Sequence, residues 1–207
     1  MDLSTTLQLF SKGGLVMYPL LACSILSFAI GLERFLFHRV HHTDTTAFLF
    51  LIKPALDQHD WNKIQEICQS VSGDIARILE HSLAEHPNNP QTLQQILETK
   101  SSLAAARLRE RLSTLENIVT VAPLLGLLGT VVGMIHTFGA ITLQSGQPHA
   151  ITGGVGEALV ATGTGLSVAI FAFVIHSYFV NRLDKEITNM EEVFGNILIH
   201  FTRNKHL

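Results

Sequence analysis

The stretch that decides the fold reads IVTVAPLLGLLGTVVGMIHTFGAI, twenty-four residues from Ile118 to Ile141 without a formal charge. Two further runs resemble it, eighteen uncharged residues over Leu15–Leu32 and twenty-three over Ala158–Val180. A helix needs about 20 apolar residues to cross a hydrocarbon core of ~30 Å. Only helices and closed barrels satisfy their backbone in lipid, and these runs lack the alternation of barrel strands. The sequence therefore predicts an all-α membrane protein with three transmembrane helices.

The composition of the chain agrees with this class. Hydrophobic residues make up 47% of the 207 residues and charged residues only 15%, whereas soluble domains carry roughly 25% charged residues. A net charge of −3 argues against a nucleic-acid partner, which requires a basic face. The sequence contains no glycine-rich nucleotide loop, no nucleophile elbow and no paired-cysteine metal motif. We therefore expect no enzyme activity, no cofactor and no metal.

The distribution of Lys and Arg predicts the orientation of the helices. Arg34 and Arg39 follow the first run and Arg182 and Lys185 follow the third, whereas the connection between the second and third runs contains neither residue type. The N-terminus and that connection are thus predicted outside, with the C-terminus in the cytoplasm. The predicted segments are an N-terminal segment 1–14, transmembrane helix 15–37, a cytoplasmic helical region 38–116, transmembrane helix 117–141, an outer loop 142–157, transmembrane helix 158–180 and a cytoplasmic C-terminal helix 181–207.

The cytoplasmic region reads as helical. Helical spacing of apolar residues over Asp57–Val71 predicts one helix, and Gly73-Asp74 predicts a break before the next helix, which runs to about Glu85. His86–Pro90 is predicted to be a loop. The long amphipathic pattern that follows shows no break before the second transmembrane run, which predicts a single rod of more than forty residues. His38, His41 and His42 form either a juxtamembrane polar cap, which we favour, or a metal site.

Small residues recur at steps of three and four along the second and third transmembrane runs. Because small residues let helix backbones approach closely in lipid, this stripe predicts helix packing. The residues expected to serve packing are Gly126, Gly129, Gly133, Gly165 and Ala169.

Hydroxyl and imidazole groups within the same runs are the candidates for a water-filled path. Thr130 and Thr162 can either bond a backbone carbonyl of their own helix or line a wet gap. His136 and His176 can either join helices or carry protons. The second and third runs contain no Asp or Glu, and Glu157 lies at the outer mouth of the third helix. If the protein moves protons, a partner must therefore supply the carboxylate. Thr137 and Thr164 complete the set as secondary candidates.

Three stretches resemble the ExbB/TolQ/MotA proton-channel family, and within it the ExbB-like branch. They are GGLVMYPLL at 13–21 with Glu33-Arg34-Phe35, APLLGLLGTV at 122–131, and EALVAT at 157–162 with Gly165-Leu166 and Val168-Ala169-Ile170. The family usually has a proline where Phe171 stands here. It also commonly has a small apolar residue at the position of Thr164.

The resemblance implies a homopentamer in the bacterial inner membrane, with the N-terminus in the periplasm. The second and third helices would line a pore that holds the single membrane helices of an ExbD-like dimer. Thr130 and Thr162 would lie on the proton pathway and Glu157 at the pore mouth. The complex would energise a TonB-like protein for outer-membrane uptake. The alternatives are a TolQ-like role in the Tol-Pal envelope system and a non-conducting membrane scaffold. A flagellar stator role is disfavoured because those subunits have four membrane helices.

Overall fold

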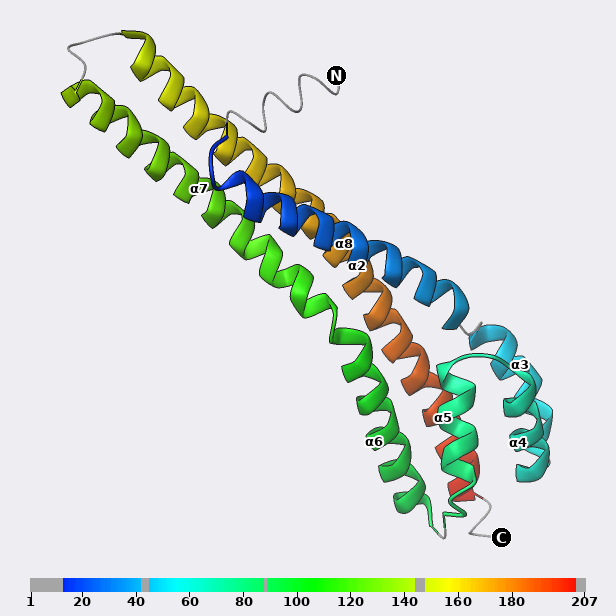
Figure 1. The fold of residues 1–207 in the computed structure, drawn as a ribbon. Coiled ribbons are helices and arrows are strands. Elements are labelled where there is room, and N and C mark those ends of the chain that lie inside the picture. Colours follow the sequence, from blue (N-terminus) through cyan, green and yellow to red (C-terminus); the bar gives the residue numbers. More distant parts are fainter. Residues whose placement is uncertain (1–12, 42–44, 88, 144–147, 204–207) are drawn as a thin grey trace. The chain divides into compact units, whose positions relative to one another are not determined.

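A computed structural model describes residues 13–41, 45–87, 89–143 and 148–203 (Figure 1). All regular secondary structure in these ranges is α-helical. The helices are α2 (Met17–His41), α3 (Thr45–Asp57), α4 (Trp61–Ser70), α5 (Asp74–Leu83), α6 (Pro90–Arg109), α7 (Leu112–Leu143) and α8 (Pro148–Arg203). Three helical stretches are long and apolar enough to cross a membrane, namely Met17–Leu36, Pro90–Gly139 and Gly153–Arg203. This confirms the predicted all-α class and the number of candidate spans.

The chain divides into two compact units, and the first combines the N-terminal part up to Leu32 with Leu112–Tyr178. Its core is a small cluster in which three alanines, Ala122, Ala169 and Ala172, pack with larger apolar side chains such as Leu20 and Ile118. Many other large apolar side chains point outward, as the 62% exposure of Phe28 and the 64% exposure of Ile135 and of Ile170 illustrate. Such an inside-out distribution suits a unit that is surrounded by lipid or by other membrane helices.

The second unit comprises Glu33–Arg111 and Phe179–Leu207. It has the apolar core of a water-soluble helical domain, to which α3, α4, α5, α6 and the last part of α8 contribute. Phe48, Ile64, Leu79 and Ile197 are almost completely buried. The Trp61 and Phe201 rings meet edge to face with their centroids 5.1 Å apart. The helix α3 lies in the region that was predicted to be helical, although the sequence analysis gave it no bounds of its own, and it continues through Pro54.

Local signals explain where the helices of this unit begin. The Asp60 side chain caps α4 by accepting the backbone N–H of Lys63, and the Asn89 side chain caps α6 by accepting that of Thr92. Pro90 occupies the first turn of α6, where its missing N–H costs nothing. Gly73 precedes α5 with a φ of 138°, a region that favours glycine. The predicted break at Gly73-Asp74 and the predicted loop before Pro90 are therefore confirmed.

Two expectations about the long helices differ from the structure. The predicted unbroken rod is interrupted at Glu110 and Arg111, between α6 and α7, although the backbone of Glu110 stays in the helical region. The connection predicted over 142–157 is largely helical, since α7 extends to Leu143 and α8 begins at Pro148. Periodicity cannot reveal a single loosened turn, and polar helix ends that extend past an apolar run resemble loop in sequence.

Candidate functional site

The helices α7 and α8 approach each other along a line of glycines. A Cβ atom placed on Gly126 would lie 3.1 Å from the Thr162 Cα atom, and one on Gly165 would lie 2.7 Å from the Ala122 carbonyl oxygen. A Cβ on Gly133 would lie 3.1 Å from the Gly154 carbonyl oxygen. A Cβ on Gly129 would collide with the Ala161 methyl group. The backbones touch where side chains would otherwise hold them apart, and this close approach fixes the geometry of the site.

One threonine bridges this contact. The Thr162 hydroxyl donates a hydrogen bond to the Gly126 carbonyl oxygen of the facing helix, with 3.0 Å between the oxygens. The bond crosses between helices because the absence of a side chain on Gly126 brings that carbonyl within reach. The donated proton leaves the lone pairs of the hydroxyl oxygen available to accept a hydrogen bond from water.

The remaining threonines bond within their own helices. The hydroxyls of Thr130, Thr137 and Thr164 donate to the carbonyl oxygens of Leu127, Gly133 and Val160 at 2.6, 2.8 and 2.8 Å. Thr137 is buried at 4% exposure, with Gly154 packed against it, whereas Thr130 and Thr164 are partly exposed. Within one chain, the hydroxyls of these three residues thus bond to backbone carbonyls of their own helices.

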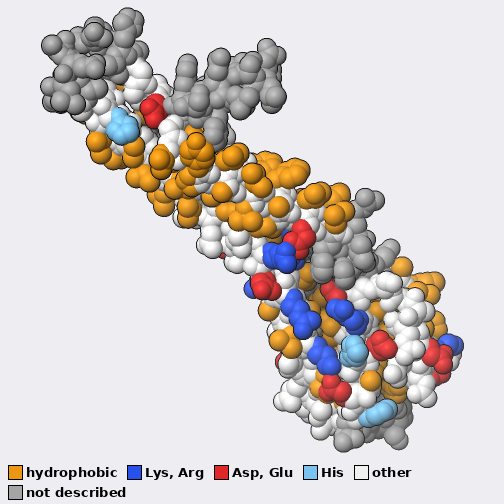
Figure 2. All heavy atoms as spheres, viewed as in Figure 1, with side chains coloured by type: hydrophobic (Ala, Val, Ile, Leu, Met, Phe, Trp, Pro, Cys, Tyr) orange, Lys and Arg blue, Asp and Glu red, His pale blue; other side chains and the backbone are white. Residues whose placement is uncertain are grey.

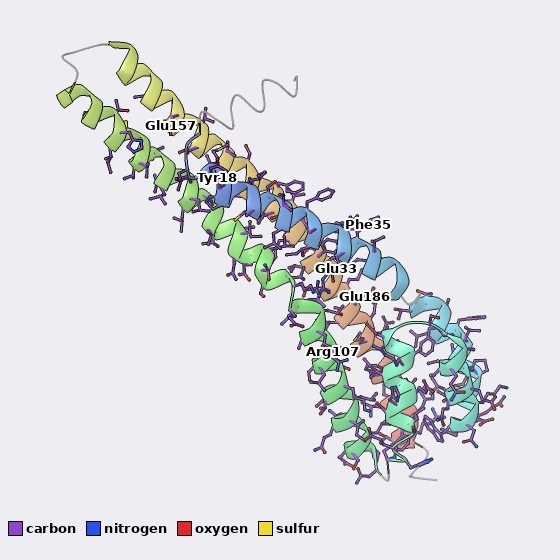
Figure 3. The ribbon with its side chains drawn as sticks, viewed as in Figure 1. Tyr18, Glu33, Phe35, Arg107, Glu157 and Glu186 are labelled. Carbon is purple, nitrogen blue, oxygen red and sulfur yellow. The ribbon has the colours of Figure 1, made fainter. Side chains whose placement is uncertain are left out.

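Glu157 lies beside the start of α2 (Figure 3). A Cβ atom on Gly14 would collide with its carboxylate oxygen, so the carboxylate and the Gly14 backbone are in immediate proximity. Gly14 has a φ of 69°, and its carbonyl oxygen accepts the N–H of Met17 at the first turn of α2. A carboxylate is favoured near a helix N-terminus by the helix dipole. The sequence did not predict this contact, although the glycine pair at 13–14 was visible beside the first apolar run.

The two membrane histidines do not join this contact. His136 on α7 is exposed and His176 on α8 is partly exposed. No group of three metal-binding side chains occurs in the part of the chain that the structure describes. The side chains of His38, His41 and His42 lie outside that part. Ala169, the last predicted packing residue, is buried in the core of the first unit.

The chemistry available along α7 and α8 is that of hydroxyls and not of acids. The runs Ile118–Ile141 and Ala158–Val180 contain no carboxylate. A threonine hydroxyl orders water and passes hydrogen bonds, but it holds no extra proton near neutral pH. The chain therefore belongs to a class of membrane proteins with several helices, in which hydroxyl groups lie along two closely packed, glycine-rich helices. The apolar runs of these two helices contain no carboxylate.

The comparisons with known proteins make this class specific. The model of the MotA/TolQ/ExbB proton channel family matches residues 70–192, more than half of the chain. The chain belongs to this family, as the resemblance in its sequence motifs implied.

Relatives of the chain occur in several organisms. An ExbB-like protein of Synechocystis sp. is 35% identical over 184 residues, which cover 86% of this chain and 72% of the relative. The biopolymer transport protein ExbB of Neisseria gonorrhoeae is 40% identical over 97 residues, which cover 45% of this chain and 43% of the relative. The Tol-Pal system protein TolQ of Haemophilus influenzae is 31% identical over 126 residues, or 58% and 54% of the two chains. The chain is thus similar to proteins of both the ExbB and the TolQ type.

Proposed function

We propose that this protein is an ExbB-like motor subunit of the bacterial inner membrane, with its N-terminus in the periplasm and its C-terminus in the cytoplasm. Together with an ExbD-like partner it uses the proton motive force to energise a TonB-like protein for outer-membrane uptake. Family membership supports the class of activity. The single observation that carries the assignment of a site is the Thr162 hydroxyl bonded across the α7–α8 contact.

The proposed pathway combines this chain with its partner. Five copies enclose a pore lined by α7 and α8, and two partner helices occupy it. Thr130 and Thr162 order the water along the lining, and Glu157 attracts cations at the outer mouth. Thr137, Thr164, His136 and His176 are secondary members of the same lining. The partner contributes the acid that binds and releases the proton, because α7 and α8 have no carboxylate in their apolar runs.

The test removes one hydroxyl while keeping the shape of the side chain. Thr162→Val is expected to lose most energy-dependent uptake through an outer-membrane receptor, and Thr162→Ser, which keeps the hydroxyl, is expected to retain it. Ser167→Ala removes a hydroxyl five residues further along α8 that bonds to the Gly163 carbonyl oxygen of its own helix, and it serves as the matched control. Thr130→Val is expected to impair uptake as well.

Assembly must be measured beside uptake. The mass of the detergent-extracted complex, with and without the partner, reports whether Thr162→Val still forms the oligomer of 22.8 kDa chains. Full uptake by Thr162→Val would contradict the proposed pathway and favour the non-conducting scaffold. Loss of uptake together with loss of the complex would assign Thr162 to packing.

A TolQ-like role is the second candidate, and the similarity to the TolQ protein of Haemophilus influenzae favours it specifically. The two roles differ in what fails when the gene is deleted. An ExbB-like subunit is needed for receptor-dependent uptake, whereas a TolQ-like subunit is needed for envelope constriction. Deletion followed by complementation with the wild-type chain decides between them.

A further inference from the structure

A basic cavity lies in the second unit. It has a volume of about 730 Å³ and is lined by charged residues from α2, α5 and α6 together with the turn between α6 and α7. Figure 2 shows Lys and Arg side chains gathered over this part of the unit, with a His side chain among them. In Figure 3, Glu33 and Arg107 mark the contributions of α2 and α6. The basic residues that line the cavity are Arg34, Arg77, Lys100, Arg107 and Arg111, together with His81.

The charge of this cavity is positive. Five Lys or Arg residues face three carboxylates, those of Glu33, Asp74 and Glu110. Three of the five cations have ion-pair partners, Arg77 with Asp74 at 2.7 Å, Arg111 with Glu33, and Lys100 with Glu85 at 2.7 Å. Arg107 is exposed, and no carboxylate of the described residues lies within ion-pair distance of its guanidinium group. The cavity therefore has capacity for an anion, and an arginine can bind a phosphate through two parallel hydrogen bonds.

The cavity is also amphipathic. Leu103, Ile78 and Leu108 line it together with the charged residues, and Leu103 is 56% exposed. Arg34 belongs to the last part of the candidate span Met17–Leu36, and the next two side chains, Phe35 and Leu36, are 49% and 56% exposed. Charged and apolar groups thus adjoin at the end of a membrane span, where the headgroups of a bilayer lie.

We propose that this basic cavity binds the phosphodiester headgroup of an anionic phospholipid from the cytoplasmic leaflet. Arg107 contacts the phosphate, Arg77 and Arg111 line the cavity in their ion pairs with Asp74 and Glu33, and the acyl chains follow the exposed apolar side chains at the end of α2. Basic pockets on the cytoplasmic side of membrane helices suit this ligand class. The proposal rests on the membrane orientation proposed above but not on proton passage. A free phosphate offers the same charge without the apolar part, so the exposed Leu103 and Leu36 favour the lipid.

The test compares bound lipids by native mass spectrometry on the full chain purified in detergent, in complex with its partner. Phosphatidylglycerol is expected to bind, and phosphatidylcholine, whose headgroup has no net charge, is expected to bind at least about tenfold more weakly. Arg107→Gln is expected to lower the affinity for phosphatidylglycerol about tenfold. Arg109→Gln removes the same charge two residues along α6, outside the cavity lining, and is expected to leave that affinity unchanged.

Three outcomes would overturn the proposal. The first is equal binding of both lipids, or equal effects of the two substitutions. The second is full displacement of phosphatidylglycerol by inorganic phosphate, which would assign the cavity to a small anion. The third is release of the partner subunit by Arg107→Gln with no change in bound lipid, which would make the cavity a protein-binding site. The lipid proposal and the proposed proton pathway can fail independently. Bound lipid measured with Arg107→Gln tests the first, and uptake measured with Thr162→Val tests the second.

Discussion

Gly163 and Gly165 lie two residues apart on α8 but in different surroundings. A Cβ atom added to Gly163 meets nothing within 4 Å, whereas one added to Gly165 lies 2.7 Å from the Ala122 carbonyl oxygen and 2.9 Å from the Gly126 Cα atom. Both neighbours of Gly165 are backbone atoms, which cannot rotate away as a side chain would. The same substitution, glycine to alanine, can therefore be compared at a tightly packed position, Gly165, and at an open position, Gly163.

Gly165→Ala is expected to destabilise the protein by about 1–3 kcal/mol relative to Gly163→Ala, because overpacking forces α7 and α8 apart. The comparison cancels the gain in helix propensity that both changes bring, about 1 kcal/mol each. Thermal or denaturant unfolding of the purified protein in detergent measures the difference. Equal stability of the two variants would show that α7 and α8 can move apart at Gly165 without a cost in stability, which would contradict the close backbone contact.

Residue spacing predicted which glycines share a face, and it could not predict which threonine differs from the others. Thr130 and Thr162 look alike in the sequence, since each lies in an apolar run and has the same two alternatives, while Thr164 is a secondary candidate. Only the structure distinguishes Thr162, whose hydroxyl reaches the Gly126 carbonyl oxygen instead of its own helix. That distinction depends on the rotation of α8 against α7, and periodicity along one helix carries no information about the neighbouring helix.

Among the elements, α6 has the most explicit start signal. The Asn89 side chain accepts the backbone N–H of Thr92 at 2.6 Å, and Pro90 follows in the first turn. The four N–H groups at a helix start have no partner within the helix, so a capping side chain contributes measurably to its stability. The cap matters here because α6 carries Lys100 and Arg107 of the basic cavity.

Asn89→Ala is expected to destabilise the first turn of α6 by about 1 kcal/mol. Amide hydrogen exchange measured by mass spectrometry should then accelerate about fivefold in peptides that cover Thr92. Gln91→Ala changes an exposed residue of the same turn and keeps the cap, so its exchange should stay at the wild-type rate. The same acceleration in both variants would mean that tertiary packing, and not the cap, holds the start of α6.

The sequence predicted the elements wherever a local signal was strong. Apolar runs located the three candidate spans, and the Gly73 break and the His86–Pro90 loop were found from turn chemistry. The interruption at Glu110 and Arg111 was missed, because neither glycine nor proline marks the change there. The helix α3 lies in the region predicted to be helical, but its bounds were not predicted. The basic cavity was missed for a different reason, since Arg77 and Arg107 come together only through packing of α5 against α6.

At the scale of the whole molecule, the two units have different physical demands. The first exposes many large apolar side chains around a small core that includes three alanines, while the second buries large apolar side chains in a larger core of its own. The helix α8 contributes to both units without an interruption from Pro148 to Arg203.

The free energy available from one proton sets a lower limit on the number of protons that the proposed complex uses per mechanical cycle. One elementary charge that crosses the membrane field gains about 2.3 kcal/mol per 100 mV, hence about 3.5 kcal/mol at roughly 150 mV. Moving a two-state element from 1:99 to 99:1 requires about 5.5 kcal/mol. One proton therefore provides less free energy than a full two-state step requires, and the proposed complex is expected to consume several protons per full mechanical cycle.

The ratio of protons to cycles can be measured after reconstitution in liposomes, with proton flux followed by a pH-sensitive dye and motion followed on a labelled partner. Tight coupling at one proton per cycle would contradict this expectation, and Thr162→Val in the same liposomes should abolish both signals if the flux uses the proposed pathway.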